Sequence, residues 1–453
     1  MYKIFLSFML ALYSASALAV TMEQALTSGY NHNEELKVIR TDFLTEIEQF
    51  PRALAGFMPK VSAVLDSTDS KTARRSGVVT SSDAITSDSL RYTQAIILEQ
   101  PIFDGWSSVA ELKAAQAGFR SARGEYYSKE QNIFLKEIEI YLTCVEAKEK
   151  YDISKVSVRS NKTQLEAMKE KFKLGESTET EVASAREGLA TAEANQALAF
   201  ANYESAKASF YQVFGIEAIG VKMPNVPGNM PSSLTILVER AIAVNPLIDS
   251  ATHKTKSSKA REYVAKGALL PKASLRIQNG RTYYNPQQGS NSNINNRSVT
   301  STLSVTVPIL SRGGIEYSDV RRAKYDTRKA AVNFDSIIKQ TKSNSKASWS
   351  QLEAARVRIK ATAQAVKAAE VAYEGMIQEE MLGSKTIVDV LRTEERLNKA
   401  RESRVEARKA LILSAYRIKA LVGELTAKSM KLKVDHFNPE AEFKKVKTKI
   451  VGF

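Results

Sequence analysis

The sequence predicts a mainly α-helical protein that is built from two similar halves, each with a long helical hairpin and a β-hairpin. Three observations in the 453 residues support this fold class: one segment occurs twice, apolar residues recur at heptad spacing, and apolar and polar residues alternate in short segments. Heptads are typical of long coiled-coil helices, and alternation is typical of half-buried β-strands. The repeated segment defines how the chain divides into two halves.

The duplication is clearest in KLGESTETEV at 173–182 and MLGSKTIVDV at 381–390, which lie 208 positions apart. Upstream, FMPKVSA at 57–63 and LLPKASL at 269–275 correspond at a spacing of 212. Further pairs at these two spacings are Gly105 and Gly313, Gly215 and Gly423, and Asn33 and Asn245.

Two structural repeats, 20–222 and 232–424, are therefore expected. The segment between them, MPNVPGNMP at 223–231, is rich in Pro and Gly and reads as a linker.

The two ends of the chain differ from the repeats. Residues 1–19 combine Lys3, an apolar run and the small-residue motif Ala17–Ala19, a pattern that predicts a secretory signal peptide and export. The apolar run is shorter than the ~20 residues of a spanning helix, which argues against an uncleaved anchor. The tail at 425–453 is basic, and the sequence leaves open whether it packs against the helices.

Long helices are predicted at 107–173 and 315–381, each followed by a shorter helix, at 176–214 and 384–422. At about 1.5 Å per residue each long helix would extend over about 100 Å. An opening helix is expected at 21–57, and the second repeat also begins with a helix. The first long helix contains no proline, and its apolar positions follow a heptad pattern: Phe119, Tyr126, Ile133, Ile140 and, after a step of four, Cys144, Tyr151, Val158, Leu165 and Phe172.

Two β-hairpins are predicted between the helices, at about 60–100 and about 272–308. In the second hairpin, Val299, Leu303 and Val305 alternate with serines and threonines, so one face is apolar and the other is polar. The first hairpin alternates less clearly, because Gln94 interrupts its apolar face. An ordinary soluble sheet stays open as an alternative, although strands of about ten residues suit a tilted membrane strand.

Four strands are too few to enclose a pore. No segment after the signal peptide is apolar enough to form a spanning helix, and open sheet edges are not tolerated in hydrocarbon. Closure of even a small barrel needs about eight strands, so two or more copies would have to combine, and three copies would supply twelve.

No motif for catalysis, a cofactor or a metal ion is found, so we expect no enzyme. Cys144 is the only cysteine, and its place in the heptad pattern suits a buried apolar position. His32, His253 and His436 are too scattered to form a ligand cluster. The formal net charge of +15 is spread along the helices in patterns such as KEK and ARE, so it indicates solvated helix faces rather than a nucleic-acid surface.

Taken together, these segments resemble the TolC family of outer membrane efflux proteins. The resemblance covers nearly the whole mature chain and rests on the MPK and LPK steps, QPIFDG at 100–105, VPILSRGG at 307–314 and, most specifically, TIVDVL at 386–391. It implies a homotrimer in which a twelve-stranded β-barrel in the outer membrane, with four strands from each chain, continues into an α-helical coiled-coil barrel in the periplasm.

The resemblance also implies a function. Such a channel is the exit duct for efflux of small molecules or for type I secretion of proteins. Its partners would be outer membrane lipid, a periplasmic adaptor protein and an inner-membrane transporter, either an efflux pump or an ABC exporter.

The duplicated segment is expected to form the turns at the tips of two helical hairpins. Glycine supplies the positive φ that ends a long helix, and a threonine and an acidic residue suit the start of the next helix. The residues expected to form the turns, and to dock an adaptor, are Leu174, Gly175, Leu382, Gly383 and Ser384.

Gating residues are implied by the resemblance at matching positions near these turns. They are Glu181, Lys385 and Asp389, and an ion pair between Glu181 and Lys385 of neighbouring coils would hold the tip closed. Two positions depart from the family pattern: Glu380 replaces a tyrosine and Arg392 replaces an acidic residue. The alternative is that these charges form an ordinary solvated helix surface.

Two other classes of protein remain as alternatives. A periplasmic adaptor protein has a long helical hairpin, but only one, flanked by lipoyl-like and small barrel domains. A soluble coiled-coil scaffold would lack the alternating strands and their loops.

Overall fold

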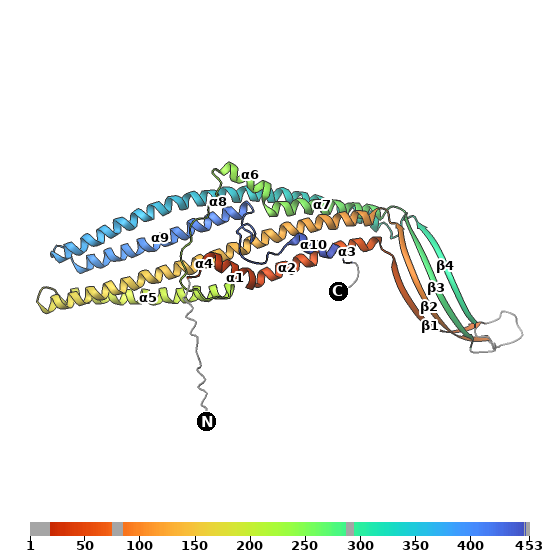
Figure 1. Ribbon diagram of the computed structural model, residues 1–453, viewed down its shortest axis with the longest axis horizontal. Coiled ribbons are helices and arrows are strands. Elements are labelled where there is room, and N and C mark those ends of the chain that lie inside the picture. The colour runs from red at the N-terminus through yellow and green to blue at the C-terminus, as the bar shows by residue number, and fades with distance from the viewer. Residues whose placement is uncertain (1–18, 75–84, 287–293, 448, 450–453) are drawn as a thin grey trace, which may run out of the picture. The chain divides into compact units, whose positions relative to one another are not determined.

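The computed structural model describes residues 19–74, 85–286, 294–447 and 449, and Figure 1 shows its elements. The expected signal peptide, residues 1–19, lies almost entirely outside the described residues. The chain forms two compact units. The helical unit contains Met1–Thr41, Glu125–Ile248 and Ile337–Phe437, and the sheet unit contains Asp42–Gly124, Asp249–Ser336 and Asn438–Phe453. Each unit combines segments from both sequence repeats.

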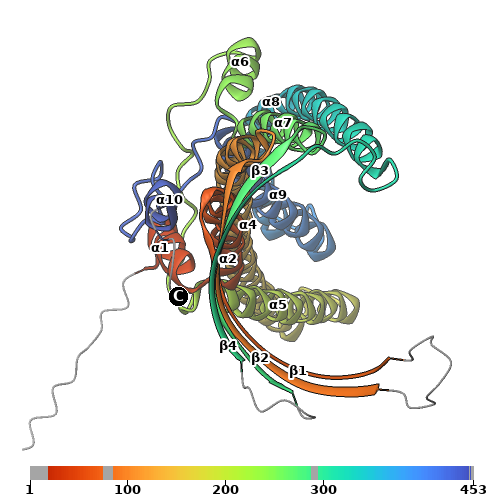
Figure 2. The same ribbon diagram turned by 90° about the vertical axis from the view of Figure 1, so that its right-hand side faces the viewer.

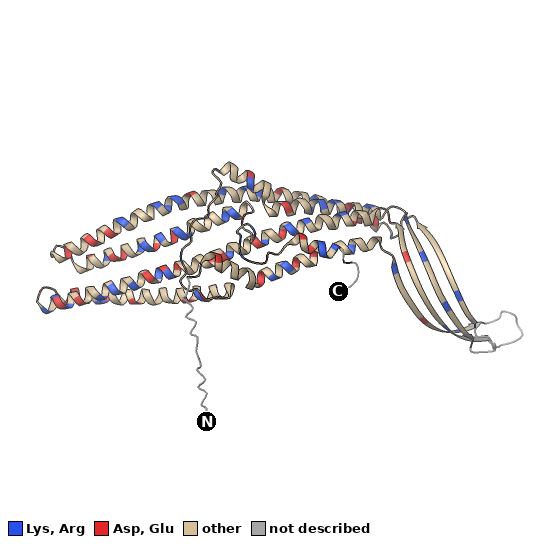
Figure 3. Cartoon of the chain, viewed as in Figure 1, with Lys and Arg blue, Asp and Glu red and all other residues tan. Residues whose placement is uncertain are grey.

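The two long helices are α4, Ser107–Lys173, and α8, Ile315–Met381, with 67 residues each. Both begin and end where the sequence pattern indicates. Positive and negative side chains are interspersed along them (Figure 3), as solvated faces require. Five of the nine heptad positions of α4 are buried, namely Phe119, Tyr126, Ile133, Cys144 and Leu165.

A shorter helix follows each long one, α5 at Glu179–Phe214 and α9 at Ile387–Leu421. Both begin three residues later than the sequence indicates. The reason is that Thr178 and Thr386 have extended backbones and act as N-caps, so the preceding residues belong to the turn. Within the helical unit, α5 runs back beside α4 and α9 runs back beside α8 (Figure 1).

The opening helix expected at 21–57 is interrupted, so that prediction is wrong in detail. The segment forms α1 at Met22–His32, α2 at Glu34–Ile47 and α3 at Gln49–Leu54, followed by a 3₁₀ turn at Ala55–Phe57. The second repeat begins with α6 at Leu234–Val244 and α7 at Pro246–Gly267. The basic tail contains the short helix α10 at Pro439–Lys447.

The repeated asparagines explain the breaks in these opening helices. Asn33 has an extended backbone, and its side-chain oxygen accepts a hydrogen bond from the backbone N–H of Glu35 at 2.8 Å. Asn245 does the same for Leu247 at 3.0 Å. In both repeats the asparagine ends one helix and satisfies a free N–H of the next.

All four strands belong to one antiparallel sheet in the order β1-β2-β3-β4. Their bounds are Lys60–Arg74, Ile85–Phe103, Lys272–Pro286 and Ile294–Thr306. The strands of the first hairpin are longer than expected, since pairing continues from Lys60 opposite Glu99 to Arg74 opposite Ile85. Figure 2 shows that the sheet is curved.

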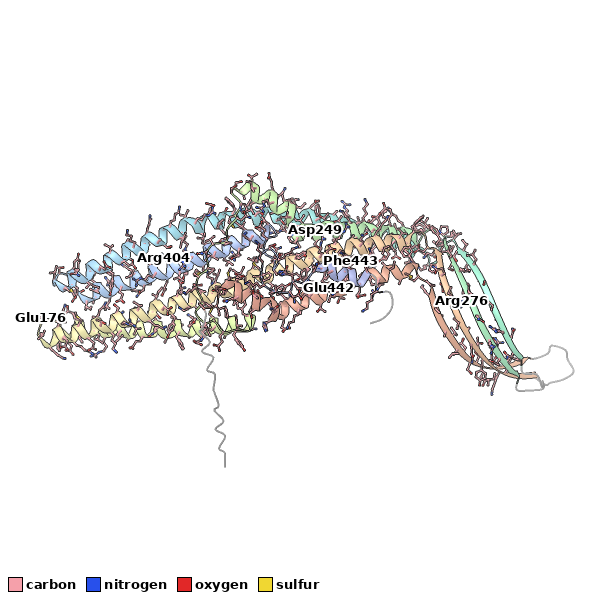
Figure 4. The ribbon with its side chains drawn as sticks, in the orientation of Figure 1. Glu176, Asp249, Arg276, Arg404, Glu442 and Phe443 are labelled. Carbon is pink, nitrogen blue, oxygen red and sulfur yellow. The ribbon has the colours of Figure 1, made fainter. Side chains whose placement is uncertain are left out.

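The pairing register gathers most apolar side chains on one face, here called the apolar face, although Gln94, Asn279, Arg281 and Arg297 lie on it too, and the other face is polar. Neighbours in register share a face, so Leu98 lies opposite both Val61 and Ile277. On the apolar face lie Val61, Ala63, Leu65, Tyr92, Ile96, Leu98, Leu275, Ile277, Tyr283, Val299, Leu303 and Val305. On the polar face lie Ser62, Asp66, Thr93, Glu99, Ser274, Arg276 (labelled in Figure 4), Gln278, Thr300, Thr302 and Ser304.

Two glycines allow close backbone contact where the strands of the sheet unit meet its helices. Gly105 lies between β2 and α4 with φ of 70°, and a Cβ there would lie 2.3 Å from the carbonyl oxygen of Gly267 at the end of α7. A Cβ on Gly267 would in turn lie 2.6 Å from the carbonyl oxygen of Gly105. No side chain fits between these two backbones.

Two carboxyl groups are buried in the helical unit on the same face of α4. Glu137 accepts a hydrogen bond from the side-chain amide of Asn33 at 2.8 Å, and its second oxygen has no hydrogen bond to any described residue. Burial raises the pKa of Glu137 to about 8 and that of Glu130 to about 7. At neutral pH Glu137 is therefore mainly protonated.

Replacing Glu137 by Gln is expected to change how stability depends on pH. The folded-state pKa of about 8 exceeds the ordinary value of 4.5, so the protonated carboxyl stabilises the fold below about pH 4.5 and loses this effect as the pH rises to 8. Glu137→Gln should thus be more stable than the parent at pH 9, on the order of a few kcal/mol, with a smaller difference at pH 5.

Thermal unfolding followed by circular dichroism at both pH values measures this effect. Glu139→Gln, at an exposed position of the same helix, is the matched control and should leave the pH dependence unchanged. Parallel pH profiles for the parent and Glu137→Gln would contradict the assignment.

Candidate functional site at the hairpin turns

The same backbone motif ends both long helices. Gly175 and Gly383 have φ of 79° and 73°, and no atom lies within 4 Å of a Cβ built on either residue. The N–H of Glu176 donates to the carbonyl oxygen of Lys171 at 2.9 Å, and the N–H of Ser384 donates to that of Glu379 at 3.0 Å. These are Schellman motifs, so glycine is required by its backbone conformation and not by crowding. Figure 4 labels Glu176 at the first turn.

The following helices begin with matching capping boxes. The N–H of Thr178 donates to Glu181 Oε2 at 2.8 Å, and the N–H of Glu181 donates back to Thr178 Oγ1 at 3.3 Å. Thr386 and Asp389 form the same reciprocal pair at 3.3 and 3.4 Å. The duplicated segment is therefore a complete turn of a helical hairpin, in which a glycine ends the first helix and a threonine caps the start of the second.

Glu181 and Asp389, two of the expected gate residues, are thus engaged in caps. Hydrogen bonds from Thr178 hold the pKa of Glu181 below its usual range, and hydrogen bonds from Thr386 do the same for the pKa of Asp389. Both groups are negatively charged at neutral pH, next to the positive end of a helix dipole.

The expected pair between Glu181 and Lys385 does not form within one chain. Lys385 is exposed and makes no ion pair with any residue that the structure describes. Glu181 Oε2 is occupied by Ser177 and Thr178. A pair between Glu181 and Lys385 of neighbouring chains stays a prediction. Arg392 is also exposed and lies on α9 beside the groove between the hairpins.

An ion pair that the sequence analysis missed links the two hairpins. Lys171 Nζ on α4 lies 2.7 Å from Glu380 Oε1 on α8, with side-chain exposures of 31% and 15%. Glu380 was singled out, but its partner was not. The sequence gives no direct signal for this pair, because at the repeat spacing of 208 Lys171 corresponds to Glu379 and not to Glu380.

A buried polar layer joins the same helices further from the turns. Gln164 Nε2 on α4 donates to Tyr373 OH on α8 at 3.1 Å and to Glu394 Oε2 on α9 at 3.0 Å. Ser160 Oγ lies 2.9 Å from the same tyrosine oxygen. Burial raises the pKa of Glu394, which is only 5% exposed. The layer fixes the register of the two hairpins, since each partner left alone would be a buried unpaired group.

Apolar packing completes the contact between the hairpins. A cluster of buried residues is formed by Leu165, Met168, Ala185, Ile387 and Val390. Gly188 on α5 allows the closest approach, because a Cβ there would lie 2.9 Å from Leu391 Cδ2 on α9. Beyond it, α4, α5 and α9 enclose a groove of about 1060 Å³ lined mainly by small and polar side chains.

The turns themselves expose large apolar side chains. Leu174 and Leu382 are 73% and 83% exposed, and Met381 is 67% exposed. Exposed apolar side chains do not contribute to the stability of the fold. A group of them at the turns therefore suits contact with a partner protein.

In the described part of the chain, no helix combines the length and apolar character needed to cross a membrane. The same residues contain no group of three or more His, Cys, Asp and Glu side chains that could hold a metal ion.

A family model described as "Outer membrane efflux protein" matches residues 48–216 and 237–424. Both halves of the chain are thus matched, in agreement with the internal repeat. The match favours the efflux family over the adaptor and scaffold alternatives. It describes efflux proteins and not enzymes.

Two curated relatives align over nearly the whole chain. The outer membrane efflux protein BepC of Brucella suis is 25% identical over 439 residues, which is 96% of this chain and 92% of the relative. The outer membrane protein TolC of Escherichia coli is 24% identical over 435 residues, which is 92% of this chain and 85% of the relative.

Solved structures share the fold. The CmeC outer membrane channel of Campylobacter jejuni superimposes with a TM-score of 0.78 at 17% identity, and the match covers 95% of this chain and 90% of CmeC. The outer membrane protein VceC of Vibrio cholerae gives a TM-score of 0.72 at 17% identity, covering 89% of this chain and 96% of VceC.

Replacing Gly383 by Ala is expected to destabilise the second turn by about 1 kcal/mol, because alanine resists the left-handed conformation. Hydrogen exchange of the backbone amides at 379–386 should become faster. Gly375→Ala is the matched control, since Gly375 lies within α8 without positive φ and with no atom within 4 Å of a built Cβ. That change should stabilise the helix slightly. Equal effects of the two substitutions would contradict the role given to Gly383.

Proposed function

The chain belongs to the outer membrane efflux protein family, and from this premise we propose that three copies form a channel-tunnel in the cell outer membrane with a periplasmic extension. Small molecules or secreted proteins would leave the cell through it. The transport partners would be a periplasmic adaptor protein and an inner-membrane transporter.

The four-stranded sheet is the observation that carries this proposal. Its order β1-β2-β3-β4 leaves one edge of β1 and one edge of β4 unpaired among the described residues. Unpaired backbone groups are not tolerated in hydrocarbon. Pairing of β4 with β1 of the next copy removes both edges, and three copies give twelve strands, enough for an aqueous pore.

The two faces of the sheet support the same assembly. The apolar face carries Leu65, Ile96 and Leu303 and suits lipid, and the polar face carries Thr93, Gln278 and Thr302 and suits a water-filled lumen. Tyr92 and Tyr283 lie opposite each other on the apolar face. Such aromatic pairs are typical of the boundary between lipid and water.

The hairpin turns are the proposed docking surface for the adaptor. Exposed Leu174, Met381 and Leu382 supply apolar contact area, and the rigid Schellman motifs present it in a fixed shape. The transporter that co-purifies with the protein would identify it as part of an efflux system or of a type I secretion system.

The gate is proposed at the contact between the two hairpins. The Lys171–Glu380 pair, the layer around Gln164 and the apolar cluster hold them together within one chain. A partly exposed ion pair such as this one contributes on the order of 1 kcal/mol, but three copies act together on one aperture. A second set of links between Glu181 and Lys385 of neighbouring chains would act in the same direction, since Glu181 Oε1 has no hydrogen bond among the described residues.

The assembly is tested by expressing the full chain and isolating the outer membrane. We expect a trimer that migrates differently before and after heating, and ion-conducting pores after reconstitution into planar lipid bilayers. A water-soluble monomer without pore activity would overturn the proposal.

The gate is tested by charge reversal. Glu380→Lys places two positive charges opposite each other, so the closed tip is destabilised and single-channel conductance should rise. The double variant Lys171→Glu/Glu380→Lys restores an opposite-charge pair and should return conductance towards the parent value. Equal conductance of all three proteins, with intact trimers, would remove this pair from the gate.

Lys385→Glu tests the proposed link between chains in the same assay and should also raise conductance. Lys360→Glu, at an exposed position within α8, serves as its control and should leave conductance unchanged.

A further inference from the structure

We propose that a groove between α4 and α7 in the sheet unit binds an anionic phospholipid of the periplasmic leaflet of the outer membrane. The groove has a volume of about 660 Å³. This is within the usual range for a small-molecule pocket. The proposal rests on the proposed function, which puts the sheet in the outer membrane.

The floor of the groove is apolar. It is formed by Val109, Ala110 and Ala117 from α4, and by Ala260 from α7 and Leu270 beyond it. The small alanine side chains keep the two helices from filling the space between them. An acyl chain would find apolar contacts along this floor.

The rim of the groove is positively charged. Lys113, Arg120, Lys256 and Lys259 line it, and all four are exposed. None of them has an ion-pair partner among the residues that the structure describes, in contrast to Lys266 at the end of the groove, which pairs with Glu262 at 2.6 Å. No acidic residue lines the groove within the described chain. Four unpaired cations around an apolar floor fit an anionic headgroup with an acyl chain.

One residue that lines the groove is an uncharged histidine, His253. Its Nδ1 is buried and has no hydrogen bond to any residue that the structure describes, and Nε2 lies 3.4 Å from Asp249 Oδ1. Burial lowers the pKa of His253, so the ring is neutral at pH 7. His253 therefore adds no positive charge to the rim of the groove.

The groove opens where the strands end. Gly105 and Trp106, directly after β2, line it, as do Gly267 and Leu270, shortly before β3. Trp106 is 64% exposed and contacts Phe103 edge to face at 5.8 Å. Exposed aromatic side chains next to an apolar strand face are typical of the lipid headgroup level. The lipid headgroups next to this end of the strands are those of the periplasmic leaflet.

These features select one kind of ligand. A free phosphate would use the cations and leave the floor empty, and a neutral lipid would use the floor and leave the cations unpaired. An anionic phospholipid uses both.

The test is native mass spectrometry of the purified trimer, titrated with phosphatidylglycerol or with phosphatidylethanolamine of the same acyl chains. We expect preferential binding of phosphatidylglycerol, with up to one molecule for each chain, and weaker binding at high salt. The variant Lys113→Gln/Arg120→Gln/Lys256→Gln/Lys259→Gln should lose affinity by about tenfold or more, because each cation near an anionic headgroup contributes.

Two control variants separate the alternatives. Ala117→Trp fills the floor and keeps the charges, so it should also lose phosphatidylglycerol, whereas a site for free phosphate would be unaffected. Neutralising four exposed lysines of α8 in the helical unit, Lys342, Lys346, Lys360 and Lys367, removes the same charge elsewhere and should leave binding unchanged.

Equal affinity of the parent and the groove variant would overturn the proposal, and so would an equal loss in the α8 control. A change of ion selectivity without a change in lipid binding would put the groove in the pore and overturn it too. Failure of the proposed function is distinguishable, because the parent would then form neither trimers nor pores, whereas failure of the lipid site leaves both intact.

Discussion

The need to pair the edge strands of a membrane sheet is the constraint on which this protein depends. Within one chain, β1 and β4 each leave one edge unpaired among the described residues, and hydrocarbon offers no hydrogen-bond partner to replace water. In the proposed assembly, association is therefore part of the folding of this sheet and not a later addition. The apolar face on one side and the polar face on the other give the association its direction, since only closure with the apolar face outward matches lipid outside and water inside.

The duplicated turn determines where the long helices end. A helix of 67 residues has to stop at a defined residue, because a shift by one position would move its apolar positions out of register with its partner. Gly175 and Gly383 end the helices, and Thr178 and Thr386 start the next ones. The same short segment thus sets the bounds of four helices. That accounts for its appearance twice in the sequence better than a role in docking alone.

Much of the fold could be predicted from the sequence, and the reasons are local. The heptads and the glycine stops define α4 and α8, and alternation defines the existence of the strands. The interrupted opening helix was missed, because Asn33 was noted as a repeated residue and not as a helix break. The strands of the first hairpin were predicted too short, since polar residues such as Ser67 and Asp69 hid their pairing with Tyr92 and Leu90.

The candidate site was predicted less completely, for a physical reason. Caps involve residues three positions apart, so the sequence indicates that threonines and acidic residues begin the helices after the turns. Glu181 and Asp389 themselves were expected as gate residues because of the family resemblance. The Lys171–Glu380 pair joins two helices across 209 positions, and no local pattern identifies it. The fold-level repeat is symmetric, but this pair is not, because Lys171 aligns with Glu379 and Glu380 aligns with Phe172. In the proposed trimer, six similar hairpins would surround the aperture while the lock repeats only three times. Release of these pairs would open three of the six gaps between neighbouring hairpins, so the aperture would widen with threefold and not sixfold symmetry.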